Sequence, residues 1–385
     1  MSERTACSGC GSTLLTERYW VPRQPVVLNY RFGSLDASRT VQRRDLELRQ
    51  CSHCGLVFNA IFDPTVIPYD ENYENRQCYS AAFGEHLRTL AADLTADNHL
   101  AGQNLLEVGC GKGDFLRLLC RTASAVGDGF DTSYEPGSEP EPPSVRFHRC
   151  YVQASDIQKP YQAVICRHVI EHVAEIGLFL REIHAIAVAA GDPVVVLETP
   201  RFEWIVEQAS FWDIFYEHCN YFPEATLAYL CRAVGFDVVR HRRVFGDQYQ
   251  LLELRPNRDR ARGTAPGIEG RASLAKFAHL ASEKLRVYSE TIAALASGGT
   301  WGIWGAGAKG VALVNQLPGD LPFVVIDSNP AKQGGVISGT SVPIVGPGDH
   351  RVAKLKLVVI ANPNYAVEIG SVLQQIGFQG TTINL

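Results

Sequence analysis

One glycine-rich segment constrains the fold of this chain more than any other feature. It reads Leu105, Leu106, Glu107, Val108, Gly109, Cys110, Gly111, Lys112, Gly113, Asp114 and Phe115. An apolar run that ends in alternating glycines predicts a strand, a tight turn and a helix of a parallel α/β sheet. Because glycine has no Cβ, the turn can pass close beneath a bulky ligand. We therefore expect a cofactor over Gly109, Gly111 and Gly113.

The acidic residues around this turn indicate which cofactor it binds. Glu107 precedes the glycines and Asp114 follows them, while a second apolar run, 125–130, ends at Asp131. Carboxylates repel a phosphate, but they attract the cationic amino-acid end of S-adenosylmethionine (SAM) and accept hydrogen bonds from its ribose hydroxyls. The pattern therefore predicts a SAM site that includes Glu107, Asp114 and Asp131.

Length and composition limit the classes to which the chain can belong. Its 385 residues, 46% of them hydrophobic, can bury two cores and a small third one. No apolar run approaches the roughly twenty residues of a membrane span, and the N-terminus carries charges and cysteines where a signal peptide is apolar. We expect a multidomain cytoplasmic protein. Its 11 cysteines fit a reducing compartment, and its net charge of -5 disfavours nucleic acid as a partner.

Two matched cysteine pairs predict a metal site. Cys7 and Cys10, and again Cys51 and Cys54, stand three residues apart, and each pair is followed by a glycine. Four thiolates in this arrangement are typical of a tetrahedral zinc ion, and a closed shell of four cysteines leaves no position for a catalytic water. The expected zinc is therefore structural.

Alternating helical and strand-like stretches between about residues 81 and 254 predict a doubly wound parallel sheet. The expected strands are 104–108, 125–130, 161–167 and 193–197, followed by a pair around 236–239 and 248–254. Ligands of such a sheet bind at the carboxyl ends of its strands.

A second α/β unit follows a passage rich in proline, glycine and arginine, 255–267, and a helical stretch, 273–296. Gly305, Gly307 and Gly310 form a G-x-G-x-x-G pattern, and the apolar run 323–326 ends at Asp327. This pattern fits a dinucleotide. It fits a sugar-nucleotide diphosphate equally well, because the helix N-terminus offers free N–H groups and a positive dipole end to any phosphate.

Taken together, these segments resemble the sugar C-methyltransferase family. The resemblance rests on the cysteine pairs, on Tyr69-Asp70-Glu71-Asn72-Tyr73, on 107–115, on Tyr216-Glu217-His218, and on 305–310 followed by 327–334. It implies a zinc-binding domain over 1–68, a central Rossmann-like SAM methyltransferase domain over 69–255, and a linker helix with a C-terminal Rossmann-like domain over 256–385.

The resemblance also implies a reaction. The central domain would methylate a carbon beside the ketone of a nucleotide-linked 4-keto-deoxysugar, and the C-terminal domain would hold the nucleotide through Gly305, Gly307, Lys309 and Asp327. Such a small-molecule partner requires no membrane, and the chain is expected to act as a monomer or homodimer.

Carbon methylation beside a carbonyl needs a base, a polar group for the enolate oxygen and an aligned sulfonium methyl. By resemblance, His218 beside Glu217 is the favoured base and His172 is the second candidate. His168, nearer to the end of its strand, is expected to touch SAM.

The segment before His218 departs from some members of the family. They carry a tyrosine two residues ahead of the glutamate, where this chain has Phe215. Tyr216 or Tyr221 could hold the enolate oxygen instead, or the substrate needs no such hydroxyl. Tyr73 and Asn75 fit a segment that covers the substrate.

Other functions fit parts of the same pattern. A histidine base also serves the O- or N-methylation of a small molecule. A zinc-binding domain joined to a SAM domain also occurs in RNA base methyltransferases, whereas an NAD-dependent oxidoreductase would use 305–310. Binding that weakens steeply with salt would indicate RNA, and NADH binding would indicate the oxidoreductase.

Overall fold

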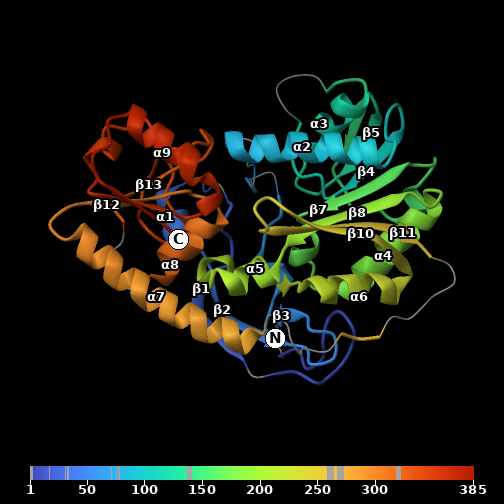
Figure 1. Ribbon diagram of the computed structural model, residues 1–385, viewed down its shortest axis with the longest axis horizontal. Helices are drawn as coiled ribbons and strands as arrows, with labels where there is room; N and C mark the ends of the chain where they lie inside the picture. The colour runs from blue at the N-terminus through green and yellow to red at the C-terminus, as the bar shows by residue number, and fades with distance from the viewer. Residues whose placement is uncertain are drawn as a thin grey trace.

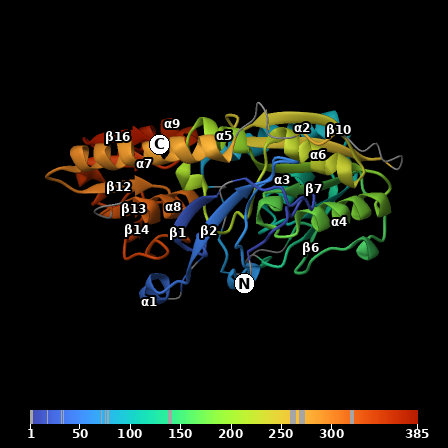
Figure 2. The ribbon, with the colours of Figure 1, turned by 90° about the horizontal axis from the view of Figure 1, so that it is seen from below.

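The computed structural model describes residues 3–16, 18–30, 32, 34–70, 72–74, 76, 79–136, 141–257, 264–266, 273–317 and 322–385. These residues form three β-sheets. Figure 1 shows a C-terminal lobe, coloured orange to red, beside a central lobe, coloured cyan to yellow. Seen from below in Figure 2, the blue strands β1 and β2 run along the junction of the two lobes. The predicted α/β fold class is confirmed.

The central sheet has the order β10-β11-β8-β7-β4-β5-β6. Its parallel strands are β4 (Asn104–Val108), β5 (Val126–Phe130), β6 (Val145–His148), β7 (Ala163–Arg167) and β8 (Val194–Pro200). Two antiparallel strands, β10 (Phe236–Val244) and β11 (Tyr249–Pro256), complete it. The sheet is therefore mixed rather than fully parallel, because a direct turn joins β10 to β11.

Helices cover both faces of this sheet. The apolar sides of α2 (Ala81–Asp97) and α3 (Asp114–Ala123) pack on Leu105, Ile165 and Val196. Those of α4 (Ile176–Ala189) and α6 (Glu224–Val234) pack on the strand residues that point the other way, such as Leu106 and Val195. Alternate strand residues thus serve two cores, which is the doubly wound arrangement.

A smaller antiparallel sheet joins segments that are far apart in the sequence. Its order is β1 (Tyr19–Pro25), β2 (Arg43–Gln50), β3 (Val57–Asn59) and β9 (Asn220–Tyr221). A short helix, α1 (Leu35–Arg39), lies between β1 and β2 in the sequence. Because β9 belongs to the central segment, the N-terminal sheet is hydrogen-bonded directly to the central lobe.

The C-terminal sheet is parallel, with the order β14-β13-β12-β15-β16. Its strands are β12 (Trp301–Trp304), β13 (Val324–Ile326), β14 (Ile344–Val345), β15 (Leu357–Ile360) and β16 (Thr381–Asn384). The helix α9 (Ala366–Gln375) packs on one face. The helices α7 (Leu274–Ala296) and α8 (Ala308–Gln316) pack on the other. This is the Rossmann-like unit that the second glycine pattern predicts.

One apolar core joins the two lobes. It contains Val21 of the N-terminal sheet, Phe202 of α5 (Phe202–Glu207), Trp212, Phe277 of α7 and Ile303 of β12, each at most 5% exposed. In Figure 1, α7 extends from the C-terminal lobe toward α5 of the central lobe. The lobes are therefore held by continuous packing as well as by the linking chain. Among the described helices, none has both the length and the apolar composition of a bilayer span.

Candidate active site

A cavity of about 270 Å³ lies between the central and C-terminal lobes. The central lobe contributes His168, Glu171, His172, Phe215, Glu217 and His218 to its wall. The C-terminal lobe contributes Gly305, Gly307, Lys309, Asp327 and Lys332. Loops at the carboxyl ends of β7 and β12 supply many of these residues, as expected for α/β sheets. The cavity thus brings together residues from both glycine-pattern domains.

Two histidines meet on the central side of the cavity. The ring centroids of His172 and His218 lie 4.7 Å apart, and the two ring planes are inclined at 84°. His172 follows the end of β7 in a short 3-10 turn, Ile170–His172. Its Nδ1 lies 3.0 Å from the carbonyl oxygen of Glu217 and 3.1 Å from the hydroxyl of Tyr69. These two contacts fix the orientation of the His172 ring.

His218 is held in its neutral form. Burial lowers the pKa of its imidazole well below the ordinary value, and the nearby charges of His172, His168 and Lys309 lower it further. The ring of Phe215 lies 4.1 Å away and excludes water from one side. A neutral imidazole at neutral pH can accept a proton, so His218 has the protonation state that a general base needs.

Glu217 anchors this segment. Its side chain is fully buried, Oε1 accepts a hydrogen bond from the Leu28 backbone N–H at 2.5 Å, and Oε2 accepts one from the Tyr73 hydroxyl at 2.8 Å. Burial raises the pKa of the Glu217 carboxyl, while His172 and these hydrogen bonds oppose the rise. Both oxygens are engaged by partners other than His218, so Glu217 fixes the loop that carries the histidine.

A buried ionic network lies behind the histidine pair. The Arg167 Nε is 2.6 Å from Glu198 Oε2, and the His168 Nε2 is 3.3 Å from Glu198 Oε1. The other ring nitrogen of His168 is 3.5 Å from Glu171 Oε1. Burial alone would lower the pKa of His168, but the two carboxylates outweigh it and raise the pKa to about 9. His168 therefore brings a positive charge to the cavity wall.

The first glycine turn has the geometry of a ligand cradle. Gly109, Gly111 and Gly113 have φ of +73°, +54° and +82°, which only glycine adopts easily. A Cβ on Gly109 would lie 2.2 Å from Cγ2 of Val169. The Gly111 backbone N–H donates to Asp131 Oδ2 at 2.8 Å, so the acid at the end of β5 holds the turn in place.

Glu107 has an oxygen that is available to a ligand. Its side chain is buried at 3% exposure, burial raises its pKa to about 8, and its Oε2 has no hydrogen-bond partner among the described residues. Buried polar atoms normally have partners, so this oxygen fits a donor from a bound molecule. Asp114 is placed differently: its side chain is 42% exposed and lies 3.6 Å from Arg117.

The second glycine turn lines the cavity, whereas, in the part of the chain that the structure describes, neither the first turn, 107–114, nor Asp131 is part of its wall. Asp327 Oδ2 accepts a hydrogen bond from the Ala306 backbone N–H at 2.7 Å. A Cβ on Gly310 would lie 1.7 Å from the carbonyl oxygen of Gly305, so the helix and the turn approach too closely for any other residue. The ammonium group of Lys309, in the first turn of α8, forms an ion pair with Asp213 of the central lobe.

Of the three tyrosines predicted to act on the substrate, one lies at the cavity. Tyr73 lines the cavity, but within the described ranges Tyr216 and Tyr221 are not part of its wall. The Tyr216 hydroxyl accepts a hydrogen bond from the Asp63 backbone N–H at 2.9 Å, and the Tyr221 hydroxyl accepts one from Phe215 N–H at 3.2 Å. Asn75 lies outside the described residues.

Sequence reasoning missed three residues that the fold brings to this region. Glu171 and Asp213 line the cavity, and Tyr69 contacts the His172 ring. Glu171 directly precedes His172, and Tyr69 opens the segment used for the resemblance, so adjacency to those residues was the available signal. Asp213 carries no such signal, because only tertiary packing brings it to Lys309.

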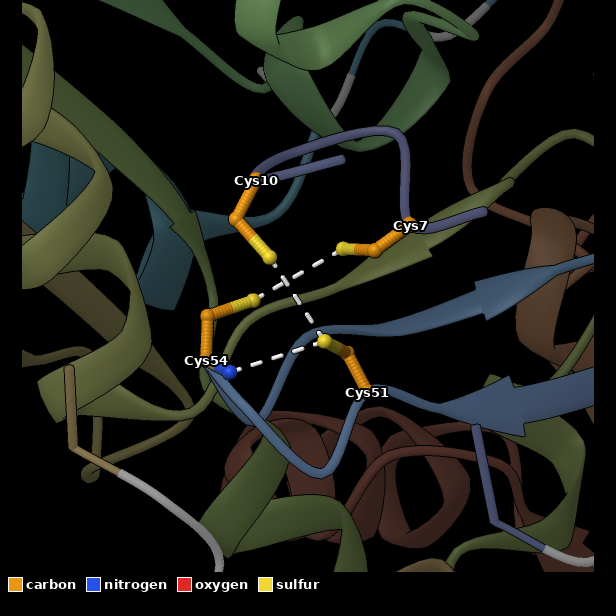
Figure 3. Close-up of side chains that lie close together, drawn as sticks. All are labelled: Cys7, Cys10, Cys51 and Cys54. Atoms are coloured by element: carbon orange, nitrogen blue, oxygen red, sulfur yellow. Dashed lines mark hydrogen bonds between the residues drawn. The ribbon is translucent and has the colours of Figure 1, made fainter. Parts of the chain in front are cut away.

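The four predicted metal ligands also meet. Figure 3 shows the sulfur atoms of Cys7, Cys10, Cys51 and Cys54 pointing toward one another. The Sγ atoms of Cys7 and Cys54 are 3.7 Å apart, those of Cys10 and Cys51 are 3.6 Å apart, and all four lie within 4.8 Å of one another. The N-terminal region therefore contains a four-cysteine cluster.

Family models match two parts of the chain. Residues 83–241 match the methyltransferase domain, and residues 259–384 match the C-methyltransferase C-terminal domain. No curated protein matches the chain. The protein is therefore a SAM-dependent methyltransferase, as the first glycine turn predicts.

Solved structures of methyltransferases are similar to part of the chain. The 1,6-didemethyltoxoflavin-N1-methyltransferase of Burkholderia thailandensis, with bound 1,6-didemethyltoxoflavin and S-adenosylhomocysteine, is 19% identical, with a TM-score of 0.33 over 45% of this chain and 78% of that one. The magnesium protoporphyrin IX methyltransferase of Synechocystis PCC 6803, with bound S-adenosylhomocysteine, is 19% identical, with a TM-score of 0.34 over 46% of this chain and 84% of that one.

Replacing Gly111 by valine should abolish cofactor binding. The branched side chain opposes a φ of +54° and occupies the space beneath the ligand, so we expect S-adenosylhomocysteine to bind at least about 100-fold more weakly in calorimetry. Gly102→Val is the matched control, since Gly102 also has a positive φ but has no atom within 4 Å of its added Cβ. Equal affinity of Gly111→Val and wild type would contradict the placement of the cofactor.

Proposed function

We propose that the protein is a C-methyltransferase that acts on a nucleotide-linked keto-deoxysugar. One observation carries this proposal: a single cavity has the histidine pair on one wall and the second glycine turn on the other. The sugar of an acceptor in this cavity can lie beside the histidine base, while its phosphates lie at the N-terminus of α8. The match of 259–384 to the C-methyltransferase C-terminal domain supports carbon as the methyl acceptor.

The cofactor is assigned to the first glycine turn. Gly109, Gly111 and Gly113 leave room for it, and the unpartnered oxygen of Glu107 would accept a hydrogen bond from it. The Asp131 carboxylate, which already accepts from Gly111 and Ser133, would use a remaining lone pair. SAM supplies an electrophilic methyl group when it is bound. His168 lies at the end of the neighbouring strand β7, so it can contact both the cofactor and the acceptor.

The reaction begins with proton removal. Neutral His218 takes the proton from the carbon beside the ketone, and His172, which the Glu217 carbonyl and Tyr69 orient, is the second candidate for this role. The positive charge of His168 on the same wall stabilises the developing enolate. With SAM bound in the first glycine turn, its sulfonium methyl would be the electrophile for this carbanion; the new C–C bond would form as the S–CH₃ bond breaks, and S-adenosylhomocysteine would leave. A positioned base contributes about 10²–10⁴-fold to such a rate.

The substrate nucleotide is assigned to the second glycine turn. The N–H groups in the first turn of α8, with Gly305 and Gly307 beside them, provide the positive end of a helix dipole for a diphosphate. Lys309, whose ammonium group pairs with Asp213, lies in the same turn, and Asp327 fixes the turn through the Ala306 N–H.

A zinc ion is assigned to the four-cysteine cluster. A Zn–S distance of about 2.3 Å places the sulfur atoms of a regular tetrahedron about 3.8 Å apart. The observed separations of 3.6 and 3.7 Å fit this value. Four thiolates complete the coordination shell, so this ion stabilises the fold and takes no part in the chemistry.

Hydrogen exchange into the acceptor tests the proposal directly. The enzyme is incubated in D₂O with S-adenosylhomocysteine and a nucleoside-diphosphate-linked 4-keto-6-deoxyhexose. We expect deuterium at one carbon beside the ketone, detected by NMR, because the base can act without methyl transfer. Methylation at oxygen or nitrogen without carbon exchange would instead favour a small-molecule O- or N-methyltransferase.

His218→Ala should separate chemistry from binding. Turnover is expected to fall by about 10²–10⁴-fold because the base is lost, while calorimetry should show an unchanged affinity for S-adenosylhomocysteine. His241→Ala is the matched control, since His241 is also partly buried but lies on β10, outside the cavity wall. A near-normal rate for His218→Ala would show that another group is the base.

The pH profile should reflect the unusual histidines. The base must be neutral, and the pKa of His218 is lowered, so kcat/KM should decline only below the ordinary histidine pKa of about 6.5. At alkaline pH, the rate should fall as His168 loses its charge near its pKa of about 9. An acidic limb centred above pH about 7 would be inconsistent with a buried, neutral His218.

Metal analysis tests the zinc assignment. We expect one zinc ion per chain in the wild type, and Cys51→Ser should lose it because three thiolates leave the shell open. Cys150→Ser should keep the ion, since Cys150 is exposed and outside the cluster. Folded wild-type protein without metal would disprove the assignment.

A further inference from the structure

We infer that Asn220 is a positioning residue that ties the four-cysteine cluster to both candidate histidines. This inference rests on the proposed function, because it concerns the placement of His172 and His218. Asn220 lies two residues after His218 in β9 and is 2% exposed.

The Asn220 side chain bridges three segments. Its Nδ2 donates a hydrogen bond to the carbonyl of Val173 at 2.7 Å, and Val173 directly follows His172. Its Oδ1 accepts a hydrogen bond from the Ser8 hydroxyl at 3.3 Å, and Ser8 directly follows Cys7. A carboxylate could not donate to Val173, and a hydroxyl would be too short to reach both partners, so the position calls for an amide.

The loop that carries His172 and the loop that carries His218 are joined by two contacts. One loop ends in the turn that carries His172, and the other runs through Glu217 and His218 to β9. They are joined by the Asn220–Val173 bond and by the contact of His172 Nδ1 with the Glu217 carbonyl. Loss of the amide would leave the partly buried carbonyl of Val173 without its donor and would loosen both loops.

The second cysteine pair holds β9 from its other side. The strand β3 begins three residues after Cys54 and pairs with β9, and the Asn59 backbone N–H donates to the carbonyl of Cys219 at 2.9 Å. The Thr226 hydroxyl donates to the Cys54 carbonyl at 2.6 Å. Both cysteine pairs are therefore linked to the segment that follows His218. The first pair is linked through the bond from Ser8 to Asn220, and the second through the pairing of β3 with β9.

The first cysteine pair also contacts the helix that follows the His172 loop. The Gly177 backbone N–H, in the first turn of α4, donates to the Ser8 carbonyl at 3.1 Å. A Cβ on Gly177 would lie 2.9 Å from the Gly9 carbonyl oxygen, so the cysteine loop rests directly on this helix. The four-cysteine cluster thus contacts the segments next to both histidines, although its cysteines are not among the described residues of the cavity wall.

Small displacements of a catalytic base have large effects. A misplacement of about 1 Å can cost about 10²-fold in rate without changing ligand affinity. Asn220→Ala should therefore lower kcat on the keto-sugar by about 10–10²-fold, while KM, the affinity for S-adenosylhomocysteine and the zinc content stay near wild type. Asn220→Asp keeps the size and the acceptor but loses the donor to Val173, and it should show the same loss.

Two further variants test whether the link between the cysteine loop and the histidine loops runs through Asn220. Ser8→Ala removes only the bond to the cysteine loop and should lower kcat less than Asn220→Ala. Asn104→Ala is the control, since that amide donates to the Pro160 carbonyl at an exposed site outside the cavity wall, and its kcat should be unchanged.

Amide hydrogen exchange tests the inference without turnover. In full-length protein, chelation of the metal and Asn220→Ala should each speed exchange in two segments, 170–173 and 216–222. Unchanged exchange in both segments, or faster exchange confined to the cysteine loops after chelation, would overturn the inference. Because this measurement needs no acceptor, it stands even if the keto-sugar is not the substrate. If Asn220→Ala does not fold, Ser8→Ala and chelation of the wild type decide the outcome.

Discussion

The site depends on the apolar core that the two lobes share. Val21, Phe202, Trp212, Phe277 and Ile303 come from the N-terminal sheet, the central segment, the long helix α7 and the C-terminal sheet, yet they belong to one buried cluster. Opening the lobes would expose this surface to water, at a cost of about 25 cal/mol for each Å² of apolar area. The two walls of the cavity are therefore fixed relative to each other, which a reaction between two bound ligands requires.

Buried polar groups fix the positions of the reactive side chains relative to this shared core. Glu217 is held by Leu28 and Tyr73, so the N-terminal segment sets the loop that carries His218. Glu198 pairs with Arg167 and His168 at the carboxyl ends of β7 and β8. Each of these carboxylates is costly to bury alone, and partners from distant segments offset that cost. The N-terminal segment thus contributes to the architecture of the site and also contains the four-cysteine cluster.

Local pattern predicted much of this structure. Both glycine turns, the strands that precede them and the meeting of four cysteines follow from spacing, because neighbouring residues determine such features. The antiparallel strand β9 and the short strand β6 could not be found this way, since tertiary pairing rather than periodicity creates them. The same limit applies to side chains: the hydroxyls of Tyr216 and Tyr221 are taken by backbone groups, and Asp213 reaches the cavity only through packing against the C-terminal lobe. The domain boundaries at 68 and 255 and the roles of the site residues stay predictions.

A crystal structure with both ligands bound would show whether donor and acceptor meet between the two lobes. The complex would contain S-adenosylhomocysteine and a nucleotide-linked 4-keto-sugar. We expect the cofactor on the first glycine turn, the diphosphate at the N-terminus of α8, and the acceptor carbon about 3–3.5 Å from the position of the transferred methyl. Ligands bound in separate pockets, with the sugar remote from His218 and the cofactor sulfur, would contradict this expectation.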